Sequence, residues 1–149
     1  MVASKYLIAF LMIVESYSPR VYADSAGVPT IGYGHALKKG EVFPDGITEE
    51  DAARLLKDDI RWAEDAIRDH VRVNLTQGQY DALVSFVYNV GSGTFSKSGL
   101  LQQLNSGDYK EAMKRLRMYN KHRVAGRLVV SNGLDWRRKM ETVFWIVPD

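Results

Sequence analysis

The hydrophobic pattern begins with an almost unbroken apolar run, residues 6–14, that ends at Glu15. We expect a helix from about Ser4 to Ser16 that is apolar nearly all round and therefore packed between other elements. The dipeptide Ser18-Pro19 stops this helix, because proline lacks an N–H and restricts the residue before it.

Two short β-prone runs follow, residues 20–23 and 28–33, and they flank the turn signal Asp24–Gly27. This arrangement predicts an antiparallel hairpin. With a period of two, the second run divides into one face with Val28, Thr30, Gly32 and Gly34 and another with Ile31, Tyr33 and His35. Since two positions of the first face have no side chain, we expect a ligand to approach it closely. The alternative is that the glycines only permit a bulge or bend.

The rest of the chain is dominated by helical periodicity. Thr48 is expected to cap a helix that runs to about His70 with one interruption. A capping box at Thr76–Gln79 opens a further helix, which Gly91 ends. Later helices are expected at about 98–105, 108–119 and 134–145, with a loop containing Gly126 before the last one. The outline is a single α+β domain, residues 1–149.

Composition narrows the chemistry. The 149 residues include no cysteine, which excludes disulfides and cysteine chemistry, and the three histidines show no metal-ligand spacing. We therefore expect no metal and no cofactor. Residues 41–69 are rich in acids whereas residues 110–139 are strongly basic, which favours an anionic partner. The alternative is an ordinary solvated helix face.

The apolar run could also belong to a secretory leader that is cleaved after Ala23. Its nine residues would make about 14 Å of helix, against about 30 Å for the hydrocarbon core of a bilayer, so it is too short to span a membrane. Cleavage after Ala23 would also remove Glu15. If Glu15 is required for activity, the cleaved-leader interpretation fails.

Glu15 and Asp24 are separated by nine residues and a proline-marked break, so the chain can fold back and place both carboxylates beside one cleft. Two carboxylates at a cleft suit glycosidic-bond hydrolysis, with one as general acid and the other as base or nucleophile. Spacing alone is weak evidence, because an aspartate in a turn is common.

Glu15, Asp24 and Thr30, followed by the motif IGYGH at 31–35, resemble the phage lysozymes, or endolysins, of glycoside hydrolase family 24. The segments at 86–95, 100–112 and 133–145 resemble the same family, so the likeness covers essentially the whole chain. It implies a lysozyme-like fold with a small antiparallel sheet in an N-terminal lobe, about 16–60, and a larger helical lobe, about 1–15 and 61–149. The active-site cleft is expected between them.

The resemblance implies a muramidase that cleaves the β-1,4 bond between N-acetylmuramic acid and N-acetylglucosamine in peptidoglycan, for phage-induced host cell lysis. Glu15 would be the general acid, and Asp24 and Thr30 would position the attacking water, which gives inversion. Inversion needs carboxyl groups roughly 6.5–9.5 Å apart, against about 5–5.5 Å for retention. His35 is structural in this family, paired with a carboxylate.

Further residues are candidates for substrate binding. Gly32 and Gly34 come from the bare strand face, and Asn89 comes from the helical lobe, where the alternative is an asparagine that caps a helix end. Either Arg137 or Arg138 corresponds to a family arginine that approaches the catalytic glutamate. The resemblance departs at the position after Glu15, where many relatives have glycine and this chain has Ser16, so the local backbone could differ.

Two alternative functions remain. A lytic transglycosylase needs the acid but no water-positioning aspartate. A basic nucleic-acid-binding helical module could use the cations Arg115, Arg117, Lys121, Arg123 and Arg127, but Tyr119 alone is thin aromatic support on that face. We expect peptidoglycan as the partner, no nucleic acid, electrostatic contact with the anionic envelope, and a monomer. Without an export signal, the expected location is the host cytoplasm, with release through a holin-like pore.

Overall fold

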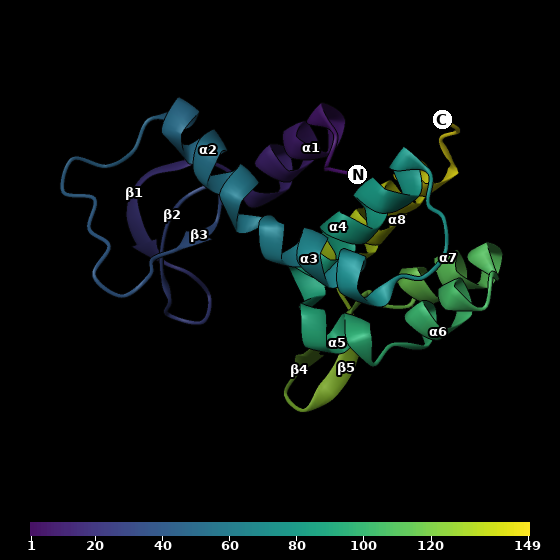
Figure 1. Cartoon of the computed structure of the whole chain (residues 1–149). Helices are drawn as coiled ribbons and strands as arrows, with labels where there is room; N and C mark the ends of the chain where they lie inside the picture. Colours follow the sequence, from purple (N-terminus) through teal and green to yellow (C-terminus); the bar gives the residue numbers. More distant parts are fainter. The chain divides into compact units, whose positions relative to one another are not determined.

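The computed structural model describes residues 1–149 and contains eight helices and five strands. They form two compact units, Lys5–Arg61 and Met1–Ser4 with Trp62–Asp149. Figure 1 shows the sheet strands β1–β3 in the first unit, in purple and blue, and most of the helices in the second. The sequence placed residues 1–15 with the helical part, whereas helix α1 (Lys5–Glu15) falls in the sheet unit.

The sheet unit contains three antiparallel strands in the order β1-β2-β3, followed by helix α2. Their bounds are Ser18–Ala23 for β1, Pro29–Gly32 for β2, His35–Ala36 for β3 and Glu49–Asp59 for α2. The predicted β1–β2 hairpin is confirmed, with Tyr22 opposite Thr30. The third strand was not predicted, because it is only two residues long and follows a two-residue turn.

The face division that the sequence predicted for the second strand is wrong beyond Gly32. β2 ends there, and Tyr33-Gly34 form the turn into β3. Gly32 has φ +66°, and a Cβ at this position would lie 3.0 Å from the Cβ of Ala52 on α2. The close approach that Gly32 permits is therefore to the protein's own helix, and Gly32 is buried.

Helix α1 buries Leu7 and Leu11 completely, but Tyr6 and Ile13 are 68% and 73% exposed. The helix was expected to be packed between other elements because it is apolar nearly all round, but one side of it faces solvent. It ends because Ser16 adopts φ +58°, the left-handed conformation usual for glycine at this position, while its N–H donates to the Met12 carbonyl at 3.1 Å. Ser16 thus keeps the backbone that a glycine would give.

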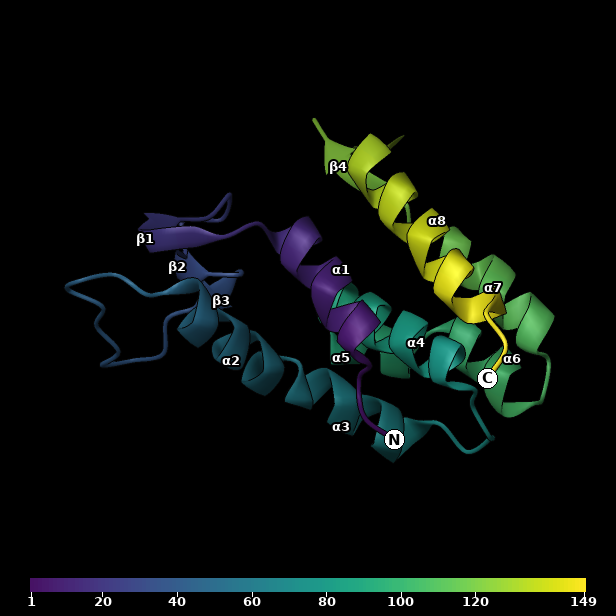
Figure 2. The same ribbon diagram turned by 90° about the horizontal axis from the view of Figure 1, so that it is seen from above.

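The helical unit is built around α4, whose residues 80–87 are all buried. Its helices are α3 (Arg61–His70, which begins at the last residue of the sheet unit), α4 (Gln77–Val90), α5 (Ser92–Ser96), α6 (Gly99–Asn105), α7 (Tyr109–Arg117) and α8 (Asn132–Ile146). Helix α8, in yellow in Figure 2, packs against α4. The two helices approach closely at Gly78, where a Cβ would lie 2.1 Å from the Phe144 carbonyl oxygen.

The predicted helix boundaries are largely confirmed. The Thr48 hydroxyl caps α2, and both hydrogen bonds of the Thr76–Gln79 capping box are present. The helical pattern after Thr48 is broken once, at Ile60. Gly91 ends α4 at φ +95°.

The loop expected around Gly126 is wrong. Lys121–Val124 (β4) and Arg127–Val130 (β5) form an antiparallel hairpin. Its two turn residues, Ala125 and Gly126, have φ +49° and φ +80°, the left-handed pair that suits a tight two-residue turn. No helix of the structure is both long enough and apolar enough to cross a membrane.

Candidate active site

Glu15 is the last residue of α1, and its side chain is half-buried against the β2–β3 turn. A Cβ at Gly34 would lie 2.9 Å from the Glu15 Oε2 atom, so a larger residue here would displace the carboxylate from this position. Gly34 also has φ +77°, which glycine adopts most readily. The structure therefore brings these two predicted site residues together, through the backbone of the turn.

Asp24 occupies the first position of the β1–β2 turn. Its Oδ1 atom accepts hydrogen bonds from the N–H groups of Ala26 and Val28, both at 2.8 Å. The turn is closed by two backbone bonds, from the Asp24 N–H to the Val28 carbonyl and from the Gly27 N–H to the Asp24 carbonyl. One carboxylate oxygen thus fixes the side chain on the turn, and Oδ2 takes no part in these bonds.

Thr30 lies on β2 and is only 4% exposed. Its hydroxyl donates to the Val28 carbonyl at 2.8 Å, which occupies its single proton. The oxygen keeps lone pairs that can accept hydrogen bonds. The two side chains are therefore both bonded to the backbone of Val28. Asp24 accepts from the Val28 N–H, and Thr30 donates to the Val28 carbonyl.

His35 joins the sheet to α2, as the structural role expected from the sequence requires. Its Nδ1 lies 2.8 Å from Asp59 and its Nε2 lies 2.9 Å from Glu41, so the pairing with a carboxylate is confirmed. Burial by itself would lower the pKa of His35, but the hydrogen bonds to Glu41 and Asp59 outweigh it and raise that pKa. The backbone N–H of Lys38 and then His35 lower the pKa of Glu41, whereas burial raises the pKa of Asp59.

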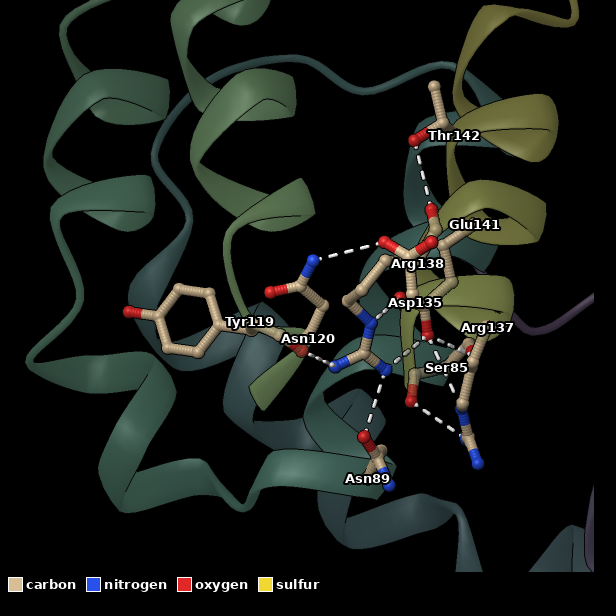
Figure 3. A network of polar contacts seen from close by, with 9 residues as sticks. All are labelled: Ser85, Asn89, Tyr119, Asn120, Asp135, Arg137, Arg138, Glu141 and Thr142. Carbon is tan, nitrogen blue, oxygen red and sulfur yellow. Dashed lines mark hydrogen bonds and ion pairs between the residues drawn. The ribbon is translucent and has the colours of Figure 1, made fainter. Parts of the chain in front are cut away.

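In the helical unit, Arg138 is fully buried at the centre of a polar network (Figure 3). Its Nε lies 2.6 Å from Glu141, its Nη1 donates to the Tyr119 carbonyl at 3.3 Å, and its Nη2 donates to the Asn89 Oδ1 at 2.9 Å. The structure thus brings together two of the predicted residues, Asn89 and Arg138. Arg138 has no exposed surface, and its contact with Asn89 holds the asparagine amide from the buried side.

Arg137 is also buried, at 5% exposure, and lies on the other side of Glu141. Its Nε is 3.5 Å from Glu141, and its Nη2 donates to the Ser85 carbonyl at 3.1 Å. Glu141 is completely buried and also accepts from the Ser85 hydroxyl at 2.5 Å. Burial raises the pKa of Glu141, and the two arginines oppose that rise.

Glu141 is the residue that sequence reasoning missed. The available signal was its spacing from Arg137 and Arg138, four and three residues before it on one helix, which places acid and base on one face. No group of three or more histidine, aspartate or glutamate side chains is placed to hold a metal ion.

The architecture and this set of side chains define a lysozyme-like α+β fold. An endolysin from Escherichia coli O157:H7 phage FAHEc1 superposes with a TM-score of 0.89 at 33% identity, covering 98% of this chain and 94% of that one. The phage lysozyme family profile matches residues 12–141, and the chain belongs to this family.

Relatives found by sequence similarity are also endolysins. The endolysin of Salmonella phage P22 is 45% identical over 105 residues, which are 68% of this chain and 72% of that protein. A SAR-endolysin of Escherichia phage Mu is 34% identical over 140 residues, 91% of this chain and 75% of the relative. Family membership thus assigns peptidoglycan lysis to the chain.

Proposed function

We propose that the chain hydrolyses the β-1,4 bond between N-acetylmuramic acid and N-acetylglucosamine, with inversion at the anomeric carbon. The observation that carries this proposal is the position of Glu15, whose carboxylate lies against Gly34 in the same compact unit as Asp24 and Thr30. An inverting glycan hydrolase needs one acid that protonates the leaving oxygen and a second group of polar side chains that positions and activates the attacking water.

Glu15 is assigned the role of general acid. Its place at the end of α1 fixes the side chain from one side, and the Gly34 backbone supports it from the other. A carboxyl group held in this way can donate its proton to the glycosidic oxygen as the bond breaks. Gly34 is accordingly a positioning residue, because a larger side chain would displace the acid.

Asp24 and Thr30 are assigned to the attacking water. Asp24 uses Oδ1 for the turn, which leaves Oδ2 to accept one hydrogen of the water. Because the Thr30 hydroxyl already donates its proton to Val28, its oxygen acts as an acceptor for the other hydrogen. A water that donates both hydrogens presents a lone pair for attack, and Asp24 takes up its proton as the new bond forms.

Asn89 is proposed to bind a sugar with its side-chain amide N–H groups. Its Oδ1 is occupied by Arg138, which fixes the amide and directs Nδ2 away from that contact. Arg138 is therefore proposed to position Asn89 rather than to bind the glycan itself. Arg137 stays a predicted substrate-binding residue.

The alternative reaction is that of a lytic transglycosylase, in which the substrate's own hydroxyl replaces water and an anhydro sugar results. Asp24 and Thr30 favour hydrolysis, since a transglycosylase has no water to hold. Mass spectrometry of muropeptides released from purified peptidoglycan tests this directly. Hydrolysis predicts reducing ends with one water added, and Asp24→Asn is expected to suppress their formation. Anhydro products from the wild type would overturn the assignment.

For access to the wall, we propose release through a separate holin-like pore. Expression of the chain alone in a bacterial host is then expected to leave cells intact, whereas coexpression with a pore-forming protein lyses them. Lysis by the chain alone would contradict this route.

A further inference from the structure

The β4–β5 hairpin has no buried residue. All eight of its strand residues are exposed, so neither face of this two-stranded sheet is covered. In both views the hairpin lies at the edge of the helical unit (Figures 1 and 2). An isolated two-stranded ribbon is only marginally stable in water. Aliphatic side chains that stay in contact with water contribute little to the stability of the hairpin, so stability does not account for them.

The strand register mixes cations and aliphatic side chains on both faces. Opposed residues of an antiparallel pair share a face, so Lys121 and Arg123 lie with Val130 and Leu128. The other face carries His122, Val124, Arg127 and Val129. The hairpin has no acidic residue.

The aliphatic side chains are well exposed to solvent. Val124 is 51% exposed, Leu128 62%, Val129 42% and Val130 51%. Two of these aliphatic side chains lie on each face of the hairpin, beside its cations, and no other part of the chain covers them.

The cations of the hairpin are not used in ion pairs. Arg123 donates to the Gly126 carbonyl and Lys121 to the Asn120 side chain, both neutral partners. The neighbouring acid, Asp135, is bound by Lys139 at 2.9 Å and by Asn120 at 3.0 Å. The positive charge of the hairpin is therefore available to an external anion.

We propose that the β4–β5 hairpin is a docking surface for an anionic lipid bilayer. The lysine and arginine side chains would contact lipid phosphates, while Leu128 and the valines enter the boundary between headgroups and acyl chains. An anionic wall polymer would satisfy the cations but would leave the aliphatic side chains in water. Cations and aliphatic side chains occur together on each face of the hairpin, and this combination favours a lipid bilayer over a wall polymer.

This surface is separate from the proposed chemistry. None of its residues belongs to the set assigned to glycan cleavage, and lipid vesicles contain no glycosidic substrate. Failure of one proposal therefore leaves the other intact.

The test is flotation of the full chain with vesicles of 30% phosphatidylglycerol in phosphatidylcholine, against vesicles of phosphatidylcholine alone. Arg123→Gln/Arg127→Gln is expected to lower partitioning roughly 10- to 30-fold, since each cation near an anionic surface contributes about fivefold. Leu128→Ser/Val129→Ser is expected to lower it roughly tenfold. Lys39→Gln/Lys57→Gln removes two exposed cations from the sheet unit and is the matched control, expected to change partitioning much less.

Thermal unfolding and cleavage of purified peptidoglycan identify any variant that fails to fold. A charge variant that floats like the wild type would overturn the proposal. So would an aliphatic variant with unchanged partitioning, because the surface would then be only electrostatic. If the charge variant keeps its binding to vesicles but loses binding to lipid-free cell walls, the hairpin would instead be assigned to a wall polymer.

Discussion

The two compact units use charged side chains in opposite ways. In the sheet unit, Glu15 and Asp24 are only partly buried, and each is placed at the end of an element beside backbone groups. In the helical unit, Arg137, Arg138 and Glu141 are at most 5% exposed, and each arginine pairs with the glutamate. The first arrangement leaves carboxylates available for reaction. The second commits its charges to the core, where their loss affects folding.

Glu15→Gln is expected to have the largest effect, on activity alone. Removing a general acid typically lowers the rate about 10²–10⁴-fold, and the amide keeps the size of the side chain. Turbidity loss of peptidoglycan suspensions measures the rate, and thermal unfolding should match the wild type. Glu50→Gln, an exposed carboxylate on α2, is the control and should keep full activity. Retained lysis by Glu15→Gln would contradict its role.

Glu141→Gln is expected to have the largest effect on stability. It leaves two buried arginines without their carboxylate, a loss that typically costs about 3–5 kcal/mol. Urea unfolding followed by circular dichroism measures it. The double variant Arg138→Met/Glu141→Leu removes both members of the closest pair and should cost less. If the double variant is less stable than Glu141→Gln, the unpaired arginine charge is not the cause of the lost stability.

Gly34→Ala tests whether the turn positions the acid. The left-handed φ and the contact with the Glu15 oxygen predict a loss of about 1–3 kcal/mol together with reduced activity. Gly40→Ala is the matched control, because Gly40 has φ +87° but nothing within 4 Å of the added Cβ. Equal losses of activity in the two variants would show that only backbone strain matters.

His35→Gln is expected to destabilise the sheet unit by about 1–2 kcal/mol, with a dependence on pH. The pKa of His35 is raised above 6.5, so the stability from its charged form is present below pH 6.5 and is lost as the pH rises through the folded pKa. The pKa of Glu41 is lowered from 4.5, so its contribution is present above that pH and is lost in acid. Urea unfolding should therefore show the largest difference from wild type between pH 4.5 and 6.5. A difference that grows above pH 8 would contradict the pairing.

Ser16→Gly is expected to give the smallest effect, a gain of about 1 kcal/mol, because Ser16 has φ +58°. Differential scanning calorimetry should show a higher Tm with unchanged lysis. A lower Tm would mean that the serine side chain stabilises the end of α1.

Most of the helical fold could be predicted because its signals are local. The Thr76–Gln79 capping box and the Asp108 cap depend on residues within one turn, and both are present. The β4–β5 hairpin was missed because its turn uses Ala125, a non-glycine residue at φ +49°, which has no sequence signature. The third strand was missed because two residues are too few to show the alternation of buried and exposed side chains that identifies a strand.

The candidate site was predictable in identity but not in arrangement. Glu15, Asp24 and Thr30 could be selected from the family motif, whereas the contact of Glu15 with Gly34 depends on where β2 ends. Gly32 was misinterpreted because sequence cannot distinguish a glycine facing a ligand from one facing Ala52. The place of Glu141 in the buried network could not be predicted, because it depends on the packing of α8 against α4, which is distant in sequence.

The most direct test of the proposed mechanism is proton NMR of the first products from a short soluble peptidoglycan oligosaccharide. If Asp24 and Thr30 position a water opposite Glu15, the new reducing end must appear first as the α-anomer and then equilibrate. A β-anomer at early times would contradict inversion, and an anhydro end would contradict hydrolysis itself.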